Sequence, residues 1–334
     1  MTKRSPSEQL DKIVERILGR SDAPLSRVKP ARPSGAKLAS AIEVIGALRD
    51  LPRPDFKARL KSDLQRRATV AAPAEKRINP IREGFHSITP YLVISGAPQL
   101  IEFFKQAFGA EERFRMKRPG TETIMHAEVK IGDSMIELAD ANAQVPPTPA
   151  SMLLRVSDVD AVYDRAVEAG ATPAQPPADQ DYGTRGGSVT DISGNSWHIF
   201  KPVAGNAIFE GLRSVTPYLN PVRSFEVIEF LRQAFGAEQV YRAQSPEGAV
   251  LHAQLRIGDS IIGMGDAHGP YQPMPCTLHL YVPDTDSVYE RALRAGATSI
   301  QPPADQPYGD RSGGVKDPFG NRWFIATHIK DVPY

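Results

Sequence analysis

The stretch VSDVDAVYDRAVEAGAT, residues 156–172, returns as VPDTDSVYERALRAGAT at residues 282–298. Other segments repeat at the same offset of 126 or 127 residues: ITPYL at 88–92 matches VTPYL at 215–219, and MHAEVKIGDS at 125–134 matches LHAQLRIGDS at 251–260. A fixed period of this length indicates a duplicated domain, because each copy has enough residues for its own core. We place the copies at residues 86–203 and 213–330.

The hydrophobic pattern divides each copy into two smaller units with the same order of elements. In the first copy, ITPYLVI at 88–94 predicts a strand, and a helical period over 97–108 ends at Gly109. Three strands follow up to residue 140, and residues 151–202 repeat the order of strand, helix and three strands. The sequence therefore predicts an α+β protein with four βαβββ units in two tandem domains.

Composition limits the class of protein. The chain has 334 residues, 41% hydrophobic and 24% charged, and no apolar run is long enough to span a bilayer. The first residues, MTKRSPSEQL, show no apolar signal segment, and the only cysteine is Cys276. These features predict a cytoplasmic protein without a membrane role.

Residues 1–84 differ in charge from the rest of the chain. They contain 19 Lys and Arg against 10 Asp and Glu, so the remainder of the chain is acidic. Apolar stripes such as Leu10, Ile13 and Ile17 predict short helices. We expect a basic helical N-terminal arm and linker that docks an acidic surface of its own body or of a partner, with a solvated linker as the alternative. Aromatic residues are nearly absent there, which argues against nucleic-acid binding.

The βαβββ order, the IGDS hairpins and the closing turns DISGNSW (191–197) and DPFGNRW (317–323) resemble the vicinal oxygen chelate superfamily of glyoxalases and bleomycin-resistance proteins. The TPYL, MHAEVKIGDS and YGxR segments are most similar to its PhnB-like branch. The resemblance implies a small-molecule cavity on one face of each sheet. It does not specify a reaction, because the superfamily contains metal-dependent isomerases, dioxygenases, thiol transferases and non-catalytic drug binders.

Alternation along the third strand of each copy identifies candidate catalytic residues. In IMHAEVKI, Ala127 and Val129 belong to the apolar series that must face the helix, so His126 and Glu128 face the cavity. The same parity directs His252 toward the cavity in the second copy. A histidine at the matched position is a candidate acid, base or ligand anchor, and the alternative is a hydrogen-bonding residue in a polar sheet face.

The resemblance also implies where a metal would bind. Metal-dependent members place one ligand on the first strand and one on the last strand of each unit, typically His and Glu. These positions hold Thr89, Glu137, Ser151 and His198 in the first copy, and Thr216, Gly263, Thr277 and Phe324 in the second. A divalent metal at Glu137 and His198 is therefore possible but not favoured, and we expect no cofactor.

Without a metal, Glu137 near His126 and His198 becomes a candidate for proton transfer. An apolar pocket raises the pKa of a carboxyl group, and an imidazole partner lowers it again. The alternative is a structural ion pair or hydrogen-bonded cluster.

The segments QPPADQDYGTRGG (175–187) and QPPADQPYGDRSGG (301–314) form a second pair of candidate sites. Prolines favour an extended backbone, and the glycines permit a tight return. In the resembled branch this loop borders the ligand cavity, so we expect Tyr182, Arg185, Tyr308 and Arg311 to contact ligand, with arginine gripping an anionic group. The alternative is that Arg185 and Arg311 pair with Asp191 and Asp317 and only fix the loop.

Three functions remain open. The first hypothesis is a protein that binds a small, partly anionic organic molecule and transforms it by metal-independent acid–base chemistry. The second is a non-catalytic sequestering protein of the drug-resistance type. The third is a divalent-metal-dependent lyase or isomerase with one degraded copy, and the missing ligands of the second copy argue against it.

Overall fold

A computed structural model describes residues 78–332, apart from residues 144, 182, 203–205 and 270. The described part belongs to one compact unit. Most of the predicted N-terminal arm lies outside the described residues, as does Tyr182. None of the described helices is long and apolar enough to cross a membrane.

The described chain contains four units, each with one strand, one helix and three further strands. Unit 1 comprises β1 (Ile88–Ile94), α4 (Ala97–Phe108), β2 (Glu111–Lys117), β3 (Ile124–Ile131) and β4 (Ser134–Asp140). Unit 2 comprises β5 (Ser151–Arg155), α5 (Val159–Glu168), β6 (Thr172–Gln180), β7 (Thr184–Thr190) and β8 (Ser196–Lys201). After the 3-10 turn η3 (Ala207–Phe209), unit 3 comprises β9 (Val215–Leu219), α6 (Ser224–Phe235), β10 (Glu238–Gln244), β11 (Val250–Ile257) and β12 (Ser260–Met264). Unit 4 comprises β13 (Thr277–Tyr281), α7 (Thr285–Arg294), β14 (Thr298–Asp305), β15 (Asp310–Lys316) and β16 (Arg322–His328). The predicted α+β class and βαβββ order are confirmed.

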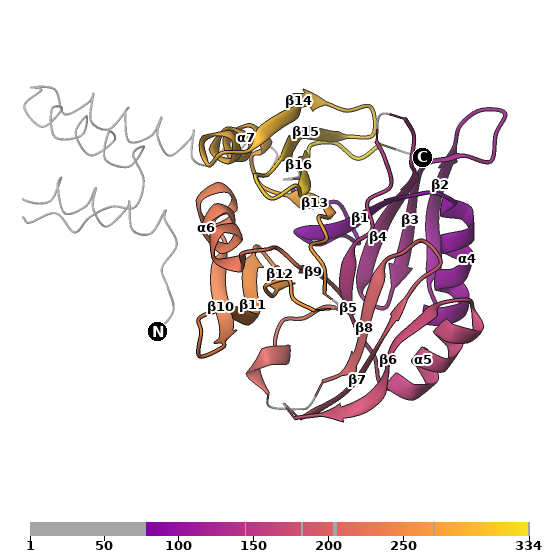
Figure 1. The fold of residues 1–334 in the computed structure, drawn as a ribbon. Helices are drawn as coiled ribbons and strands as arrows, with labels where there is room; N and C mark the ends of the chain where they lie inside the picture. Colours follow the sequence, from indigo (N-terminus) through magenta and orange to yellow (C-terminus); the bar gives the residue numbers. More distant parts are fainter. Residues whose placement is uncertain (1–77, 144, 182, 203–205, 270, 333–334) are drawn as a thin grey trace, which may run out of the picture. The chain divides into compact units, whose positions relative to one another are not determined.

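The four units form two eight-stranded mixed sheets, and each sheet combines both copies (Figure 1). Sheet 1 joins units 1 and 4 in the order β14-β15-β16-β13-β1-β4-β3-β2. Sheet 2 joins units 2 and 3 in the order β10-β11-β12-β9-β5-β8-β7-β6. At the joins, β1 pairs antiparallel with β13, with Thr89 opposite His279, and β5 pairs antiparallel with β9, with Leu153 opposite Thr216. Each sheet face is therefore built from strands far apart in the sequence.

The hydrophobic core links the two sheets within each copy. Helix α4 packs beside sheet 1 and α5 beside sheet 2, and the two helices contact each other. Phe104 and Phe108 of α4 meet Trp197 of β8, with ring centroids 5.3 and 4.7 Å apart. Phe235 meets Trp323 in the same way at 4.7 Å. Both tryptophans are fully buried.

A buried aspartate explains the closing turns DISGNSW and DPFGNRW. Asp191 accepts hydrogen bonds from the backbone nitrogens of Ser193 and Asn195 and, at 2.9 Å, from Trp197 Nε1. Asp317 accepts a matching bond from Trp323 Nε1 at 3.0 Å. The aspartate thus closes the turn and positions the core tryptophan. The alternative considered from the sequence, in which Arg185 and Arg311 pair with these aspartates, is wrong, because both arginines bind other carboxylates.

The repeated proline and glycine residues also have a structural role. A Cβ atom at Gly187 of β7 would lie 3.0 Å from the nitrogen of Pro177 in β6. At Gly313 of β15, a Cβ atom would lie equally close to the nitrogen of Pro303. Only glycine permits this close approach without displacement, because the clash would be with backbone atoms.

We expect Asp191→Ala to lower the free energy of unfolding by about 2–4 kcal/mol, because the indole N–H and turn amides would lose a buried acceptor. The measurement is urea unfolding followed by tryptophan fluorescence. Asp164→Ala, an exposed change on α5, is the control and should shift stability by less than about 0.5 kcal/mol. Equal effects of the two substitutions would contradict the role given to Asp191.

Candidate functional site

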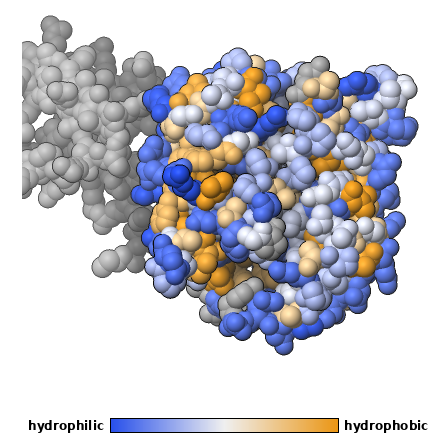
Figure 2. Space-filling view, viewed as in Figure 1, coloured by the Kyte–Doolittle hydropathy of each residue, from blue (hydrophilic) through white to orange (hydrophobic). Residues whose placement is uncertain are grey.

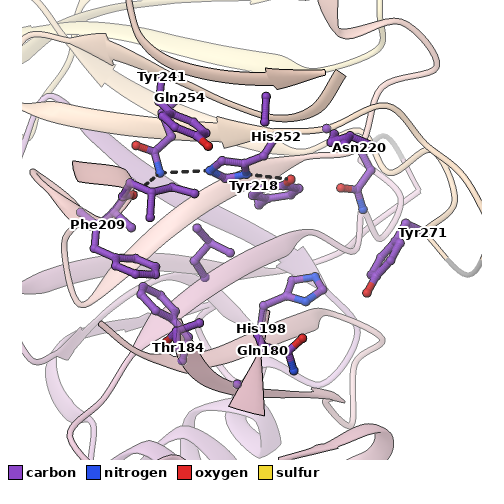
Figure 3. Close-up of a pocket in the computed structure, with 18 of the residues that line it drawn as sticks. Gln180, Thr184, His198, Phe209, Tyr218, Asn220, Tyr241, His252, Gln254 and Tyr271 are labelled. Carbon is purple, nitrogen blue, oxygen red and sulfur yellow. Dashed lines mark hydrogen bonds between the residues drawn. The ribbon is translucent and has the colours of Figure 1, made fainter. Parts of the chain in front are cut away.

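A cavity of about 570 Å³ lies against sheet 2, within the size range of small-molecule sites (Figure 3). Its walls come from both copies and from the linker between them. The first copy contributes Leu153, Gln175, Gln180, Thr184, Gly186, Gly187, His198, Ile199 and Phe200. The linker contributes Ile208, Phe209 and Leu212, and the second copy contributes Tyr218, Asn220, Tyr241, Ala243, Leu251, His252, Gln254, Gly265, Asp266, His268 and Tyr271.

Gln254 fixes the tautomer of His252. The amide nitrogen of Gln254 donates to the carbonyl oxygen of Ile208 at 2.6 Å and lies 3.1 Å from His252 Nε2. Because an amide nitrogen can only donate, His252 Nε2 accepts and Nδ1 carries the proton. Nδ1 donates in turn to the hydroxyl oxygen of Tyr218 at 3.2 Å, as the dashed lines of Figure 3 show. The Tyr218 hydroxyl therefore keeps its own proton for donation to another group.

Two glycines make room for Tyr218. A Cβ atom at Gly263 of β12 would lie 2.7 Å from the Tyr218 ring, and one at Gly265 would lie 2.9 Å from its hydroxyl oxygen. In the space left by these glycines the Tyr218 ring stacks on His252. The two ring centroids are 5.7 Å apart, and the angle between the ring planes is 15°. Gly263 occupies the position that Glu137 holds in unit 1, since each pairs with the equivalent tyrosine, Tyr218 or Tyr91. The tyrosine thus packs where the repeat would otherwise place a carboxylate.

His198 is the second imidazole in the cavity and lies on the other side of the Tyr218 ring from His252 (Figure 3). Its ring centroid is 6.1 Å from that of Tyr218 and 5.7 Å from that of Tyr271. Burial lowers the pKa of His198 to about 4, and burial lowers the pKa of His252 to about 4 as well. Both imidazoles are therefore neutral near pH 7.

The cavity lining carries almost no charge. None of the described residues that line it is Lys or Arg. The acidic residue among them, Asp266, accepts hydrogen bonds from the backbone nitrogens of Ser224 at 2.6 Å and Val250 at 2.8 Å. That carboxylate anchors the start of α6 to β11, so the groups left for a ligand are aromatic rings, amides, hydroxyls and neutral imidazoles.

The loop arginines bind the helices. Arg185 donates from Nε and Nη2 to Asp160 of α5, both at 2.6 Å, and from Nη1 to Asp179 at 3.1 Å. Arg311 makes the equivalent contacts with Asp286 of α7 and, at 2.8 Å, with Asp305. Both guanidinium groups are thus engaged by protein carboxylates. Tyr308 is 40% exposed.

Sheet 1 presents a different set of side chains. Glu137 is buried and its carboxylate lies 2.9 and 3.1 Å from Nδ1 of His279 on β13. His126 Nε2 lies 3.2 Å from Glu128 and 4.0 Å from Glu137. The predicted parity of His126 and Glu128 is confirmed, because both reach the side of sheet 1 where Glu137 lies. The sequence reasoning missed His279, which comes from the other copy.

Glu137 and His198 do not share a site. Glu137 belongs to β4 in sheet 1, whereas His198 belongs to β8 in sheet 2. The metal site considered at Glu137 and His198, which the sequence did not favour, is therefore ruled out, because each sheet forms between copies. For the same reason His198 does not belong to the candidate proton-transfer group around Glu137. On sheet 2 the first and last strands pair Leu153 with His198 in unit 2 and Tyr218 with Gly263 in unit 3, and the two first strands pair with each other. These positions offer one imidazole and no carboxylate, which does not fit a divalent metal.

Comparison with known proteins agrees with this fold. A model of the glyoxalase/bleomycin resistance protein/dioxygenase superfamily matches residues 84–199 and 223–325. An uncharacterized protein of Mycobacterium bovis is 33% identical over 130 residues, covering 36% of this chain and 86% of that protein. Another M. bovis protein, named as a candidate glyoxylase, is 28% identical over 219 residues, covering 59% of this chain and 78% of that protein. Maize glyoxalase I superimposes with a TM-score of 0.55 at 14% identity, covering 72% of this chain and 92% of that chain, which supports the fold alone.

We expect His198 and His252 to make the protein less stable in acid. Their folded-state pKa values lie below the ordinary value of 6.5, so the unfolded chain binds more protons between about pH 6.5 and 4. Stability should therefore fall as pH falls through this window, by up to about 1.4 kcal/mol per pH unit for each histidine.

Urea unfolding of the wild type and of His252→Gln, each at about pH 7 and about pH 5, measures this effect. The difference in stability between the two pH values should shrink in His252→Gln. His86→Gln serves as the control, because His86 lies away from the cavity and contacts Asp259. An unchanged pH dependence in His252→Gln would contradict the assignment of a depressed pKa.

Proposed function

Because this chain belongs to the glyoxalase/bleomycin resistance protein/dioxygenase superfamily, whose fold implies small-molecule binding, we propose that its sheet 2 cavity binds an uncharged aromatic organic molecule without transforming it. The observation that carries the proposal is the lining of the cavity. Aromatic rings and three imidazoles surround it, of which His198 and His252 are neutral near pH 7, and the one carboxylate among the described lining residues is bonded to backbone amides. This revises the expectation of a partly anionic ligand.

Desolvation supports an uncharged ligand. A carboxylate or phosphate entering the cavity would lose its hydration shell and find no cationic side chain among the described lining residues. A flat ring can instead pack on Tyr271, Phe209 and the Tyr218 ring, since aromatic pairs favour offset or edge-to-face contacts. The Tyr218 hydroxyl and the Gln254 amide are both hydrogen-bonded to His252, and these linked polar groups would orient such a ring.

The geometry favours retention of the ligand over catalysis. General acid–base catalysis needs groups with pKa values near the working pH. His198 and His252 have pKa values of about 4, and His252 is bonded on both ring nitrogens. The third lining imidazole, His268, packs edge-on against Tyr271. The residues proposed to contact ligand are His198, His252, Tyr218, Tyr271 and Phe209.

We expect 2-naphthol to raise the melting temperature of the protein, and 2-naphthoate, which has the same ring and a negative charge, to do so at least about ten-fold less effectively. Differential scanning calorimetry over a concentration series, followed by isothermal titration, gives the two affinities. Tighter binding of 2-naphthoate would show that the cavity selects anions.

A substitution that fills the cavity should remove binding. Ala243 lines the cavity from β10, and Ala243→Phe adds a ring to that wall. We expect about a ten-fold or greater loss of 2-naphthol affinity with a melting temperature close to that of the wild type. The matched control is Met116→Phe, because Met116 holds the equivalent position on β2 of sheet 1. Equal losses in both variants would place binding elsewhere.

A further inference from the structure

Five polar side chains meet on sheet 1, and basic and acidic residues alternate along their series of contacts. Arg82, in the segment before β1, donates from Nη2 to Glu128 Oε1, and His126 Nε2 lies 3.2 Å from the same oxygen. His126 Nε2 also lies 4.0 Å from Glu137, whose other side meets His279 Nδ1. Glu128 and Glu137 face each other as register partners on β3 and β4.

Three of these side chains are buried and the other two, Arg82 and His126, are half-buried, so buried charges must be balanced locally. The exposed fractions of Glu128, Glu137 and His279 are 7%, 3% and 8%. Burial by itself would raise the pKa of Glu137, but the charge and hydrogen bond of His279 bring it below its ordinary value. Burial would lower the pKa of His279, and Glu137 raises it above its ordinary value instead. Two carboxylates thus meet one guanidinium, Arg82 on Glu128, and the imidazole of His279 on Glu137.

The geometry around Arg82 holds its guanidinium in place. The guanidinium carbon lies 4.0 Å from the centroid of the Phe85 ring, and Phe85 packs edge-on against Tyr281 of β13 at 5.8 Å. The carbonyl of Pro80 accepts a hydrogen bond from the backbone nitrogen of His328. The segment is therefore fixed to sheet 1 on both sides of Arg82.

The equivalent place on sheet 2 provides an internal comparison. REGFHSITPYL at 82–92 aligns with FEGLRSVTPYL at 209–219, so Arg82 corresponds to Phe209. Glu128 corresponds to Gln254 and Glu137 to Gly263. The cation and both carboxylates are present together on sheet 1 and absent together from sheet 2, which indicates that the arginine and the carboxylates form one functional set.

We propose that His126, Glu128 and Glu137 form a cation site that the chain fills with its own Arg82, and that removal of Arg82 turns it into a divalent-metal site. Ligand atoms of these three residues lie within 4.8 Å of one another. One imidazole and two carboxylates are ligands suited to Zn²⁺ or Co²⁺. The guanidinium of Arg82 on Glu128 repels a second cation, so the native arrangement does not fit the metal that other superfamily members hold.

The test is a Co²⁺ titration of chelator-treated protein, followed by visible absorption and calorimetry. Arg82→Gln and Arg82→Ala should each bind one equivalent of Co²⁺ at least about a hundred-fold more tightly than the wild type, because a nearby positive charge is gone. Arg82→Lys, which keeps the charge, should behave as the wild type. Phe209→Ala, the matched change on sheet 2, should bind Co²⁺ no more tightly than the wild type.

Two further measurements locate the site. Adding Glu137→Gln to Arg82→Gln should abolish the tight binding, and methylguanidinium should compete with Co²⁺ in Arg82→Ala because both cations need the same carboxylates. Near-ultraviolet circular dichroism verifies that each variant is folded. The proposal is overturned if the wild type binds Co²⁺ as tightly as the variants, if a folded Arg82→Gln binds none, or if the Glu137 substitution leaves the affinity unchanged. None of these results depends on 2-naphthol binding to sheet 2.

Discussion

Antiparallel pairing between first strands of different copies is the contact on which the rest of the structure depends. β1 pairs with β13 and β5 pairs with β9, so the middle of each sheet is a junction between copies. Because the cavity-facing residues of the first strands lie at that junction, each site takes side chains from both copies. The cavity beside sheet 2 thus brings Leu153 and His198 next to Tyr218 and His252.

This arrangement lets duplicated sequences serve different roles. Sheet 1 carries Arg82, Glu128 and Glu137, where sheet 2 carries Phe209, Gln254 and Gly263. A buried carboxylate without a partner is strongly destabilising, so the charged residues are expected to be kept or lost as a set. With the set gone, the Tyr218 ring lies against Gly263. The described residues that line the adjoining space include no Lys or Arg, and their one carboxylate, Asp266, is bonded to backbone amides. The surface seen in Figure 2 is mainly hydrophilic, with exposed hydrophobic residues such as Phe225 and Val240 gathered over α6 and β10.

The repeated loop QPPADQ…YGxR…GG shows how a motif can suggest a site and serve the fold. Its arginines bind aspartates in the first turns of α5 and α7, where the helix dipole favours a carboxylate. Its glycines leave space for the prolines of the neighbouring strand to pack closely. Arginine in a loop beside a cavity is equally compatible with ligand binding and with an ion pair. Sequence periodicity does not distinguish these, because the pairing aspartates lie 25 residues away along the chain.

The sequence by itself determined the duplication, the order of strands and helices, and the side of the strand on which His126, Glu128 and His252 lie. These follow from local periodicity and from the repeat, which need no knowledge of distant contacts. Only the tertiary structure decided that Glu137 meets His279 and Arg82, whereas His198 belongs to the other sheet. The physical reason is that β1 carries nearly the same hydrophobic pattern as β9, so the pattern cannot select which first strand pairs with which; packing of whole units makes that choice.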